Sequence, residues 1–312
     1  MAAIRIEGIS KRFGSVQALD RLTLAVEPGT VFGFLGPNGA GKTTTIRILT
    51  GLARPDAGRA WVAGVEVGDG KGLARRIGCL PEEPACYPWM TPREFLDYIG
   101  RVFGLSAAER TARTRELLEL VGLTEVERRR IGTFSRGMRQ RMGLAQALVN
   151  RPEVLFLDEP ASALDPAGRR EVLELIGRLR GQCTVFMSTH ILADVERVCD
   201  SVGIINRGRL VTEARQEELL ARYAVPAFEV EVENGAAAEL AAWVETLRRQ
   251  PWVAAVAVDG SRARVTVNDV VHARQELLSA AAQSALPVVR YEVVRPSLEE
   301  VFLRLVGEEG ER

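Results

Sequence analysis

One glycine-rich segment constrains the fold of this chain more than any other feature. It reads Gly36-Pro37-Asn38-Gly39-Ala40-Gly41-Lys42-Thr43 and matches the pattern G-x-x-x-x-G-K-[ST]. In such a loop the backbone N–H groups surround phosphate oxygens, and the lysine reaches the terminal phosphates. The loop needs a buried strand before it and a helix after it, so that the positive helix end faces the anion. Residues 31–35 are an apolar run, and a helical pattern begins at Thr44, as the loop requires.

Further apolar runs predict the sheet to which this loop belongs. They occupy residues 154–157, 184–187 and 202–205, and helical patterns separate them. Continuous apolar strands of this kind are typical of a mostly parallel sheet that is covered on both faces. Between about residues 90 and 150 the pattern is almost entirely helical. We therefore predict an α/β domain over residues 1–222, with a helical subdomain inserted at about 90–150.

The pattern changes past residue 222, where we place the start of a second domain, residues 223–312. Apolar and acidic residues alternate from Phe228 to Glu233, as in a half-buried strand. A helical face follows, then two short runs around the hairpin signal Asp259-Gly260, a second helical stripe and a last alternating run. The two helical stripes contain Leu240, Trp243, Val244 and Leu247, and then Val270, Leu277, Leu278 and Ala281. The order β-α-β-β-α-β predicts a small ferredoxin-like α+β domain, with a closing helix that begins near Ser297.

Two adjacent acids, Asp158 and Glu159, end the apolar run at 154–157. Ligands of doubly wound sheets bind at the carboxyl ends of strands, and paired acids are costly to bury there without a cation or a proton. Asp158 fits a role linked to Mg²⁺, and Glu159 fits a base that polarises the attacking water. The alternative is that these acids cap a helix.

The order of the motifs resembles that of an ABC transporter ATPase over about residues 4 to 220. Four segments follow the phosphate loop at the spacing of that family: Ser135-Arg136-Gly137-Met138-Arg139-Gln140, Asp158-Glu159, Ser162-Ala163-Leu164-Asp165 and His190. The Ser135 segment corresponds to the signature that separates this family from other phosphate-loop ATPases. The resemblance implies a P-loop NTPase fold of the ABC type, ATP hydrolysis, and ATP and Mg²⁺ as cofactors.

The resemblance also implies roles for individual residues. Phe13 matches the aromatic residue that stacks on adenine, although many proteins bury a phenylalanine in the core instead. Lys42 binds the terminal phosphates, and Thr43 ligates Mg²⁺, with Thr44 beside it. His190 matches the histidine that senses the γ-phosphate. The expected contacts to ATP held by the opposite subunit come from the signature and from the loop that crosses the dimer interface: Ser135, Gly137, Met138 and Asp165.

Two departures from the family pattern are clear. Met138 stands where the signature usually has glutamine, and Glu82 stands where a Mg²⁺-linked glutamine is usual. A carboxylate can still ligate Mg²⁺, so Glu82 remains a predicted metal ligand. Both departures, together with the tail at residues 296–303, resemble bacterial exporter ATPases for drugs, antibiotics or sodium.

Composition limits the partners. The chain has 41 basic and 41 acidic residues, and residues 224–312 carry nine basic against fourteen acidic ones. Nucleic-acid binding usually needs a basic surface, so we expect no nucleic-acid partner. No apolar run reaches the roughly 18 residues of a membrane-spanning helix. The four cysteines show no C-x-x-C spacing, and we expect neither a metal site nor a disulfide framework from them.

The resemblance implies a transmembrane permease subunit as partner, a homodimer of the ATPase chain, and a cytoplasmic location on the inner face of the cell membrane. An alternative is a soluble ABC-type ATPase that acts on ribosomes or on another non-transport partner. Such ribosomal proteins usually carry two ATPase units in one chain, and this chain has one. DNA-maintenance ATPases insert long coiled coils between the phosphate loop and the signature, and the roughly one hundred residues here show no sustained heptads.

Overall fold

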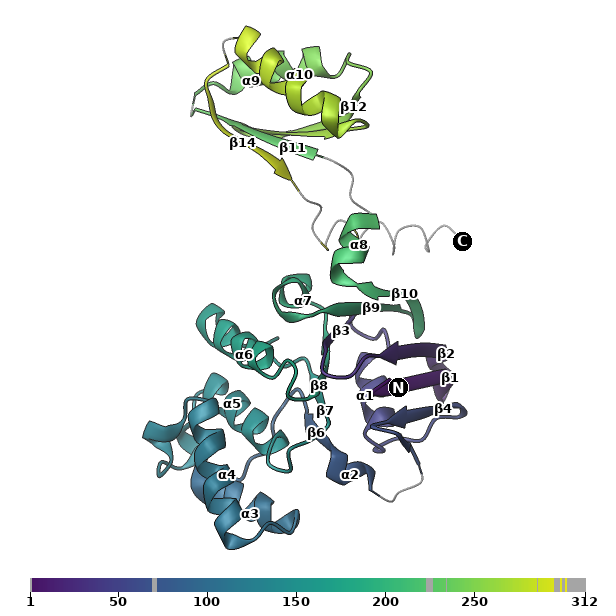
Figure 1. The fold of residues 1–312 in the computed structure, drawn as a ribbon, viewed down its shortest axis with the longest axis vertical. Helices are drawn as coiled ribbons and strands as arrows, with labels where there is room; N and C mark the ends of the chain where they lie inside the picture. The colour runs from purple at the N-terminus through teal and green to yellow at the C-terminus, as the bar shows by residue number, and fades with distance from the viewer. Residues whose placement is uncertain are drawn as a thin grey trace. The chain divides into compact units, whose positions relative to one another are not determined.

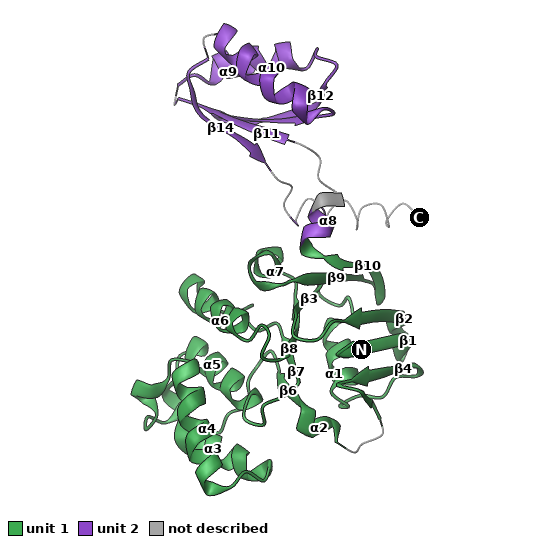
Figure 2. Cartoon of the chain, in the orientation of Figure 1, with its two compact units in different colours: residues 1–216 green, residues 217–312 purple. Residues whose placement is uncertain are grey.

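The structure is a computed structural model, and it describes residues 2–68, 72–222, 227–233, 235–284, 286–294, 298 and 301. The chain folds into two compact units, residues 1–216 and residues 217–312 (Figure 2). The first unit contains two sheets and the second contains one, and each unit has its own core. Each unit is described below by itself.

The first unit is built on a six-stranded sheet in the order β10-β9-β3-β8-β7-β6 (Figure 1). Its strands are β3 (Val31–Leu35), β6 (Ile77–Leu80), β7 (Val154–Asp158), β8 (Thr184–Thr189), β9 (Ser201–Asn206) and β10 (Arg209–Arg215). The five strands from β9 to β6 run parallel, and β10 pairs antiparallel with β9. The four predicted apolar runs are β3, β7, β8 and β9, so the predicted parallel sheet is confirmed.

A second, antiparallel sheet lies beside it in the order β2-β1-β4-β5. Its strands are β1 (Ile4–Phe13), β2 (Val16–Val26), β4 (Ala57–Val62) and β5 (Val65–Glu66). The helix α1 (Lys42–Leu49) lies between the two sheets, and a short helix α2 (Leu73–Arg76) precedes β6. Ile46 of α1 belongs to a core that also holds Ile6 of the antiparallel sheet and Phe34, Phe156 and Phe186 of the parallel sheet. Burial of these apolar side chains on both sides fixes α1, and with it the loop that precedes it.

The opposite face of the parallel sheet is covered by α5 (Arg136–Ala147), α6 (Pro166–Arg178) and α7 (Leu192–Val198). The fit of α7 on the sheet depends on Gly33. A Cβ atom at this position would lie 2.9 Å from Sγ of Cys199 and 3.0 Å from Cγ1 of Val195. A larger residue in β3 would therefore push α7 away from the sheet.

The region between β6 and β7 is helical, as predicted. It contains α3 (Pro92–Val102), α4 (Ala107–Leu120), two 3₁₀ turns (Thr124–Val126 and Ile131–Thr133) and α5. Both α3 and α4 begin with a capping box, in which Thr91 pairs with Glu94 and Ser106 pairs with Glu109. Each box satisfies N–H groups that a helix start leaves unpaired, so these boundaries are set locally. Among the described helices none is both long and apolar enough to cross a membrane.

The second unit has the predicted ferredoxin-like topology. After α8 (Gln216–Arg222), its elements are β11 (Ala227–Val232), α9 (Ala237–Leu247), β12 (Val253–Asp259), β13 (Arg262–Val267), α10 (Val270–Gln283) and β14 (Val288–Val294). The strands form one antiparallel sheet in the order β12-β13-β11-β14. The predicted hairpin at Asp259-Gly260 joins β12 to β13.

One face of this sheet and the two helices α9 and α10 form the core of the second unit. All four residues of the first predicted stripe, including Trp243, are buried. The second stripe is correct for Leu277 and Ala281, but Leu278 is 49% exposed. Most of the predicted closing helix lies outside the described residues. Two of its residues, Leu298 and Val301, are described, and both are buried.

Candidate functional site

Three loops of the first unit meet at one edge of the parallel sheet. β3, β8 and β7 are neighbours, and they carry at their carboxyl ends the glycine-rich loop, His190 and the pair Asp158-Glu159. In the strand register, Leu35 lies opposite Thr189, and Asp158 lies opposite Ser188. The strand order therefore brings together segments that are far apart in the sequence, at the edge where parallel sheets bind ligands.

The glycine-rich loop has the backbone of a phosphate cradle. Gly39 and Gly41 have φ angles of 80° and 110°, in the region that favours glycine. A Cβ atom on Gly36 would lie 2.3 Å from the carbonyl oxygen of Ile205, and one on Gly41 would lie 2.7 Å from that of Ala18. The helix α1 starts at Lys42 without a side-chain cap. Its first N–H groups have no partner within the helix, so they suit an anion such as a nucleotide phosphate.

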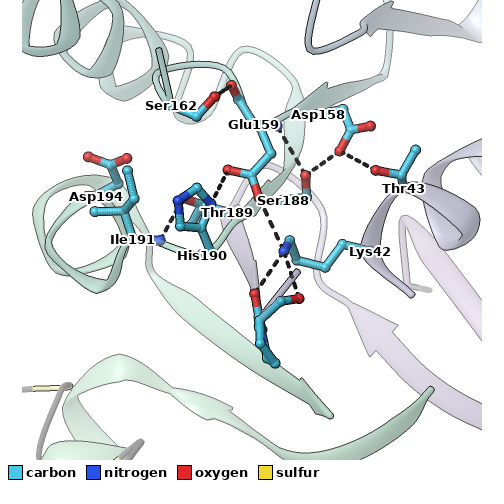
Figure 3. A network of polar contacts seen from close by, with 12 residues as sticks. Lys42, Thr43, Asp158, Glu159, Ser162, Ser188, Thr189, His190, Ile191 and Asp194 are labelled. Atoms are coloured by element: carbon cyan, nitrogen blue, oxygen red, sulfur yellow. Dashed lines mark hydrogen bonds and ion pairs between the residues drawn. The ribbon is translucent and has the colours of Figure 1, made fainter. Parts of the chain in front are cut away.

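Lys42 lies inside this loop and is 6% exposed. Its ammonium group donates hydrogen bonds to the carbonyl oxygens of Gly36, at 2.7 Å, and Pro37, at 3.2 Å. It also forms an ion pair with Glu159, with 3.2 Å between Nζ and Oε1 (Figure 3). Because both charged groups are buried, each is held by the other.

Glu159 lies between Lys42 and His190. Its second carboxylate oxygen, Oε2, is 2.9 Å from Nδ1 of His190, and its backbone N–H donates to Oγ of Ser188 at 3.1 Å. The residue is 8% exposed and has a φ angle of 47°, a left-handed conformation that costs energy for a residue other than glycine. The carboxylate is thus fixed from both sides. It is followed by a turn and not by a helix, so the capping alternative for these acids is wrong.

Asp158 anchors the other half of the network in Figure 3. Its Oδ1 accepts a hydrogen bond from the hydroxyl of Thr43 at 3.2 Å and another from the hydroxyl of Ser188 at 2.6 Å. The pair Thr43 and Asp158 offers two hard oxygen ligands side by side, which fits Mg²⁺. Ser188 is fully buried and was not predicted as a site residue. The signal for it in the sequence is a polar residue directly after the apolar run of β8.

The other predicted residues lie outside this network. Ser135 caps α5 by accepting the N–H of Met138 at 3.2 Å, and Asp165 caps α6 by accepting the N–H of Gly168 at 3.0 Å. Phe13, the last residue of β1, is 53% exposed, which excludes the alternative of a core phenylalanine. Gly137 lies in the first turn of α5, where an added Cβ atom would point into open space. None of these residues hydrogen-bonds to the phosphate loop within the described chain.

Glu82 forms no hydrogen bond or ion pair with Thr43 or Asp158 within the described residues. It lines a cavity of about 300 Å³ together with Arg136 and Arg139 of α5. Cys79, in the strand β6 that precedes this segment, is half-buried. Burial, helped by the charge of Asp158, raises the pKa of its thiol to about 11. The segment after β6 thus connects the sheet edge to the helical region.

Comparison with known proteins agrees with this geometry. Residues 19–162 match the family described as ABC transporter, and residues 216–306 match the C-terminal domain described as ATP-binding protein DrrA1-3-like. An uncharacterized ABC transporter ATP-binding protein of Bacillus subtilis is 40% identical, covering 97% of this chain and 99% of its own length. This chain belongs to the ABC transporter ATP-binding proteins. A daunorubicin resistance ATP-binding protein of Streptomyces coeruleorubidus is 38% identical, covering 98% of this chain and 96% of its own length.

The ABC ATPase fold is also found among solved structures. One, described as the ATP binding subunit of an ABC transporter, is 30% identical with a TM-score of 0.64 and covers 71% of this chain and 93% of that one. The chain is therefore an ATP-binding protein and an ATPase of the P-loop class, and it is similar to an ATP-binding protein named for daunorubicin resistance.

Proposed function

We propose that this ABC ATPase hydrolyses ATP to power a separate transmembrane permease, and that the complex is an exporter. One observation carries the catalytic part of the proposal: Lys42, Asp158, Glu159 and His190 converge from three adjacent strand ends. The export direction is supported by the relative named for daunorubicin resistance, which matches almost the whole chain. The location that follows is the cytoplasmic face of the cell membrane.

In the proposed site the nucleotide phosphates bind the N–H groups of the loop from Gly36 to Thr44 and the ammonium group of Lys42. Thr43 and Asp158 would hold Mg²⁺, with Glu82 as a further ligand. A bound Mg²⁺ neutralises the charge that develops on the phosphate oxygens.

The carboxylate of Glu159 takes a proton from the attacking water and orients that water toward the phosphorus. Its position beside His190, 2.9 Å away, lets the imidazole hold the carboxylate in place while responding to the γ-phosphate. The left-handed backbone at Glu159 is consistent with a functional residue that the surrounding structure holds in an unfavourable conformation.

Two copies of the chain complete each site in this proposal. Ser135, Gly137, Met138 and Asp165 lie outside the network formed within one chain. They would contact ATP held by the second copy, while the exposed ring of Phe13 stacks on adenine. The chain therefore works as a homodimer.

The base is tested with Glu159→Gln, measured by ATP binding, hydrolysis and size-exclusion chromatography. The amide cannot take a proton, so we expect ATP binding to persist while turnover falls by at least about a hundredfold. ATP should then hold two copies together and produce a dimer peak. Glu153→Gln, at the opposite end of β7, is the matched control, because its exposed carboxylate makes a salt bridge far from the loop. Normal turnover by Glu159→Gln would refute the assignment.

The shared site is tested by mixing Lys42→Ala chains with Ser135→Arg chains. A mixed dimer contains one intact composite site, so hydrolysis should be partly restored. Heterodimers that form and stay inactive would contradict this arrangement.

The partner is tested by purifying the tagged chain from the membrane fraction of its own cells. We expect a polytopic membrane protein to co-purify and to stimulate ATP hydrolysis. If the chain sediments with ribosomes and no membrane protein stimulates it, the transport proposal fails even if the ATPase assignments hold.

A further inference from the structure

The helices α6 and α7 each follow a loop of the site. α6 begins directly after Asp165, and α7 begins two residues after His190. Three ion pairs join these helices or the residues that follow them: Arg169–Asp194 at 2.6 Å, Glu174–Arg197 at 3.1 Å and Arg180–Asp200 at 3.1 Å. The first pair lies at the ends that are nearest the site.

The Arg169–Asp194 pair differs from the others in its burial. The side chain of Asp194 is 3% exposed and that of Arg169 is 30% exposed, whereas Glu174 and Arg197 are 50% and 45% exposed. Exposed ion pairs such as Glu174–Arg197 contribute little to the stability of the fold. A buried carboxylate that loses its charged partner is strongly unfavourable. The position of Asp194 is therefore tied to that of Arg169.

The catalytic groups act electrostatically on Asp194. Burial raises the pKa of this carboxyl group, and the hydrogen bond and charge of Arg169 oppose that effect. The charges of Glu159 and His190 also act on it, in opposite directions. Figure 3 shows Asp194 beside Ile191, the residue that follows His190.

Besides this ion pair, the start of α7 is held by a hydrogen bond from the N–H of Ile191 to Oγ1 of Thr189, at 3.0 Å, and by the packing of Val195 on β3. Ile191, the residue before the helix, provides no side-chain cap, and the helix has seven residues. A helix of this length is not stable by itself and takes its orientation from tertiary contacts. The backbone N–H of Asp194 donates to the carbonyl oxygen of Ile191 at 3.2 Å, so the buried side chain and the turn after His190 move together.

Arg169 is connected in the same way to the loop that ends at Asp165. Its backbone N–H donates to the carbonyl oxygen of Asp165 at 2.9 Å, which places the guanidinium one turn into α6. One ion pair therefore links the loop of Asp165 to the loop of His190.

We propose that Arg169 and Asp194 are positioning residues for ATP hydrolysis: their ion pair fixes the start of α7 and so keeps the ring of His190 against Glu159. The inference rests on the proposed roles of Glu159 and His190. It predicts that the pair acts on catalysis through His190 and not through nucleotide binding.

The test measures kcat and KM for ATP with radiolabelled ATP, so that slow variants remain measurable. Asp194→Asn keeps the shape of the side chain and removes its charge. We expect kcat to fall by about tenfold or more, while KM changes by less than about twofold, because the ground-state contacts to ATP are intact. In a His190→Ala background the same substitution should cause no further loss beyond about twofold, because residues that act as one unit are not additive.

Glu174→Gln is the matched control. It breaks an ion pair between the same two helices at the solvent, and kcat should stay within about twofold of the unmodified chain. Arg169→Lys is the second variant, because it keeps the charge and loses the planar guanidinium. Its kcat should lie between that of the unmodified chain and that of Asp194→Asn. If Asp194→Asn does not fold, Arg169→Lys in both backgrounds provides the same comparison.

Three results would overturn the inference. They are an unchanged kcat in folded Asp194→Asn, an equal loss in the presence and absence of His190, and a loss that appears in KM alone. Failure of the proposed function looks different, because His190→Ala and Glu159→Gln would then themselves hydrolyse ATP at the normal rate.

Discussion

Replacing Ser188 by alanine gives a direct test of the network around Asp158. The hydroxyl is fully buried and donates to the Asp158 carboxylate at 2.6 Å. A hydrogen bond to a charged group contributes about 1.5–3 kcal/mol to stability. The other partners are not left unpaired: the N–H of Glu159 keeps the carbonyl oxygen of Ser188, at 3.2 Å, and Asp158 keeps the hydroxyl of Thr43, at 3.2 Å. We therefore expect a destabilisation of about 2 kcal/mol and no larger penalty.

The same substitution should weaken the proposed metal site. Ser188 orients the carboxylate that we assign to Mg²⁺, and loss of such an orienting bond typically costs about 10–100-fold in metal affinity. The Mg²⁺ concentration for half-maximal ATP hydrolysis should rise by at least about tenfold. Stability is read from urea unfolding, with the transitions of the two units fitted separately because a two-domain chain need not unfold in one step.

Thr184→Val is the matched control for this experiment. Thr184 lies at the other end of β8, and its buried hydroxyl accepts the N–H of Gly29 at 3.0 Å. That bond involves no charged group, so its loss should cost about 1 kcal/mol and leave the Mg²⁺ dependence unchanged. If Ser188→Ala destabilises no more than Thr184→Val and keeps the normal Mg²⁺ dependence, the reasoning about Asp158 is wrong.

Three further outcomes are expected. Glu82→Gln should keep basal hydrolysis within about tenfold, a change of about 1.4 kcal/mol in the barrier, because either side-chain oxygen can face Mg²⁺; a thousandfold loss would contradict this. Burial raises the pKa of Cys79 and of Cys86 to about 11, so both thiols stay protonated at about pH 8. Iodoacetamide should therefore label them about a hundredfold more slowly in the folded chain than in urea, and equal labelling rates in the two conditions would contradict this. Trp243→Ala should destabilise the second unit by about 3–5 kcal/mol in urea unfolding and leave ATP affinity unchanged, since the ring is a core residue of that unit; a loss of ATP binding would show that the second unit contributes to the nucleotide site.

Local signals explain what the sequence predicts well. The phosphate loop needs a glycine-rich turn with a strand before it and a helix after it, and all three lie within a few residues of Lys42. The buried strands are continuous apolar runs. The helix starts at Thr91 and Ser106 carry their own capping boxes.

The parts that escaped prediction depend on contacts between distant segments. The antiparallel sheet is not predicted from the sequence because β1 is irregular. Its pairing with β2 shifts register between Ile6 and Ile9 and at further points between Ile9 and Arg12, and these shifts interrupt the two-residue alternation of a strand. Ser188 and Asp158 are 30 residues apart, and only the pairing of β7 with β8 joins them. Leu278 follows the buried Leu277 directly, and neighbouring residues on a helix point in different directions.

The atoms that surround the phosphate loop also limit the substitutions that this loop can accept. At Gly36 and Gly41 the nearest atoms to an added Cβ are backbone carbonyl oxygens, 2.3 Å and 2.7 Å away, which cannot turn aside as a side chain can. A Cβ atom added to Gly39 would meet no atom within 4 Å. The φ angle of Gly39 is 80°, a conformation that asparagine and aspartate also adopt. In a library with every substitution in this loop, positions 36 and 41 should accept only glycine, whereas position 39 should drift among glycine, asparagine and aspartate. The two invariant positions are thus set by the neighbouring chain, independently of any phosphate.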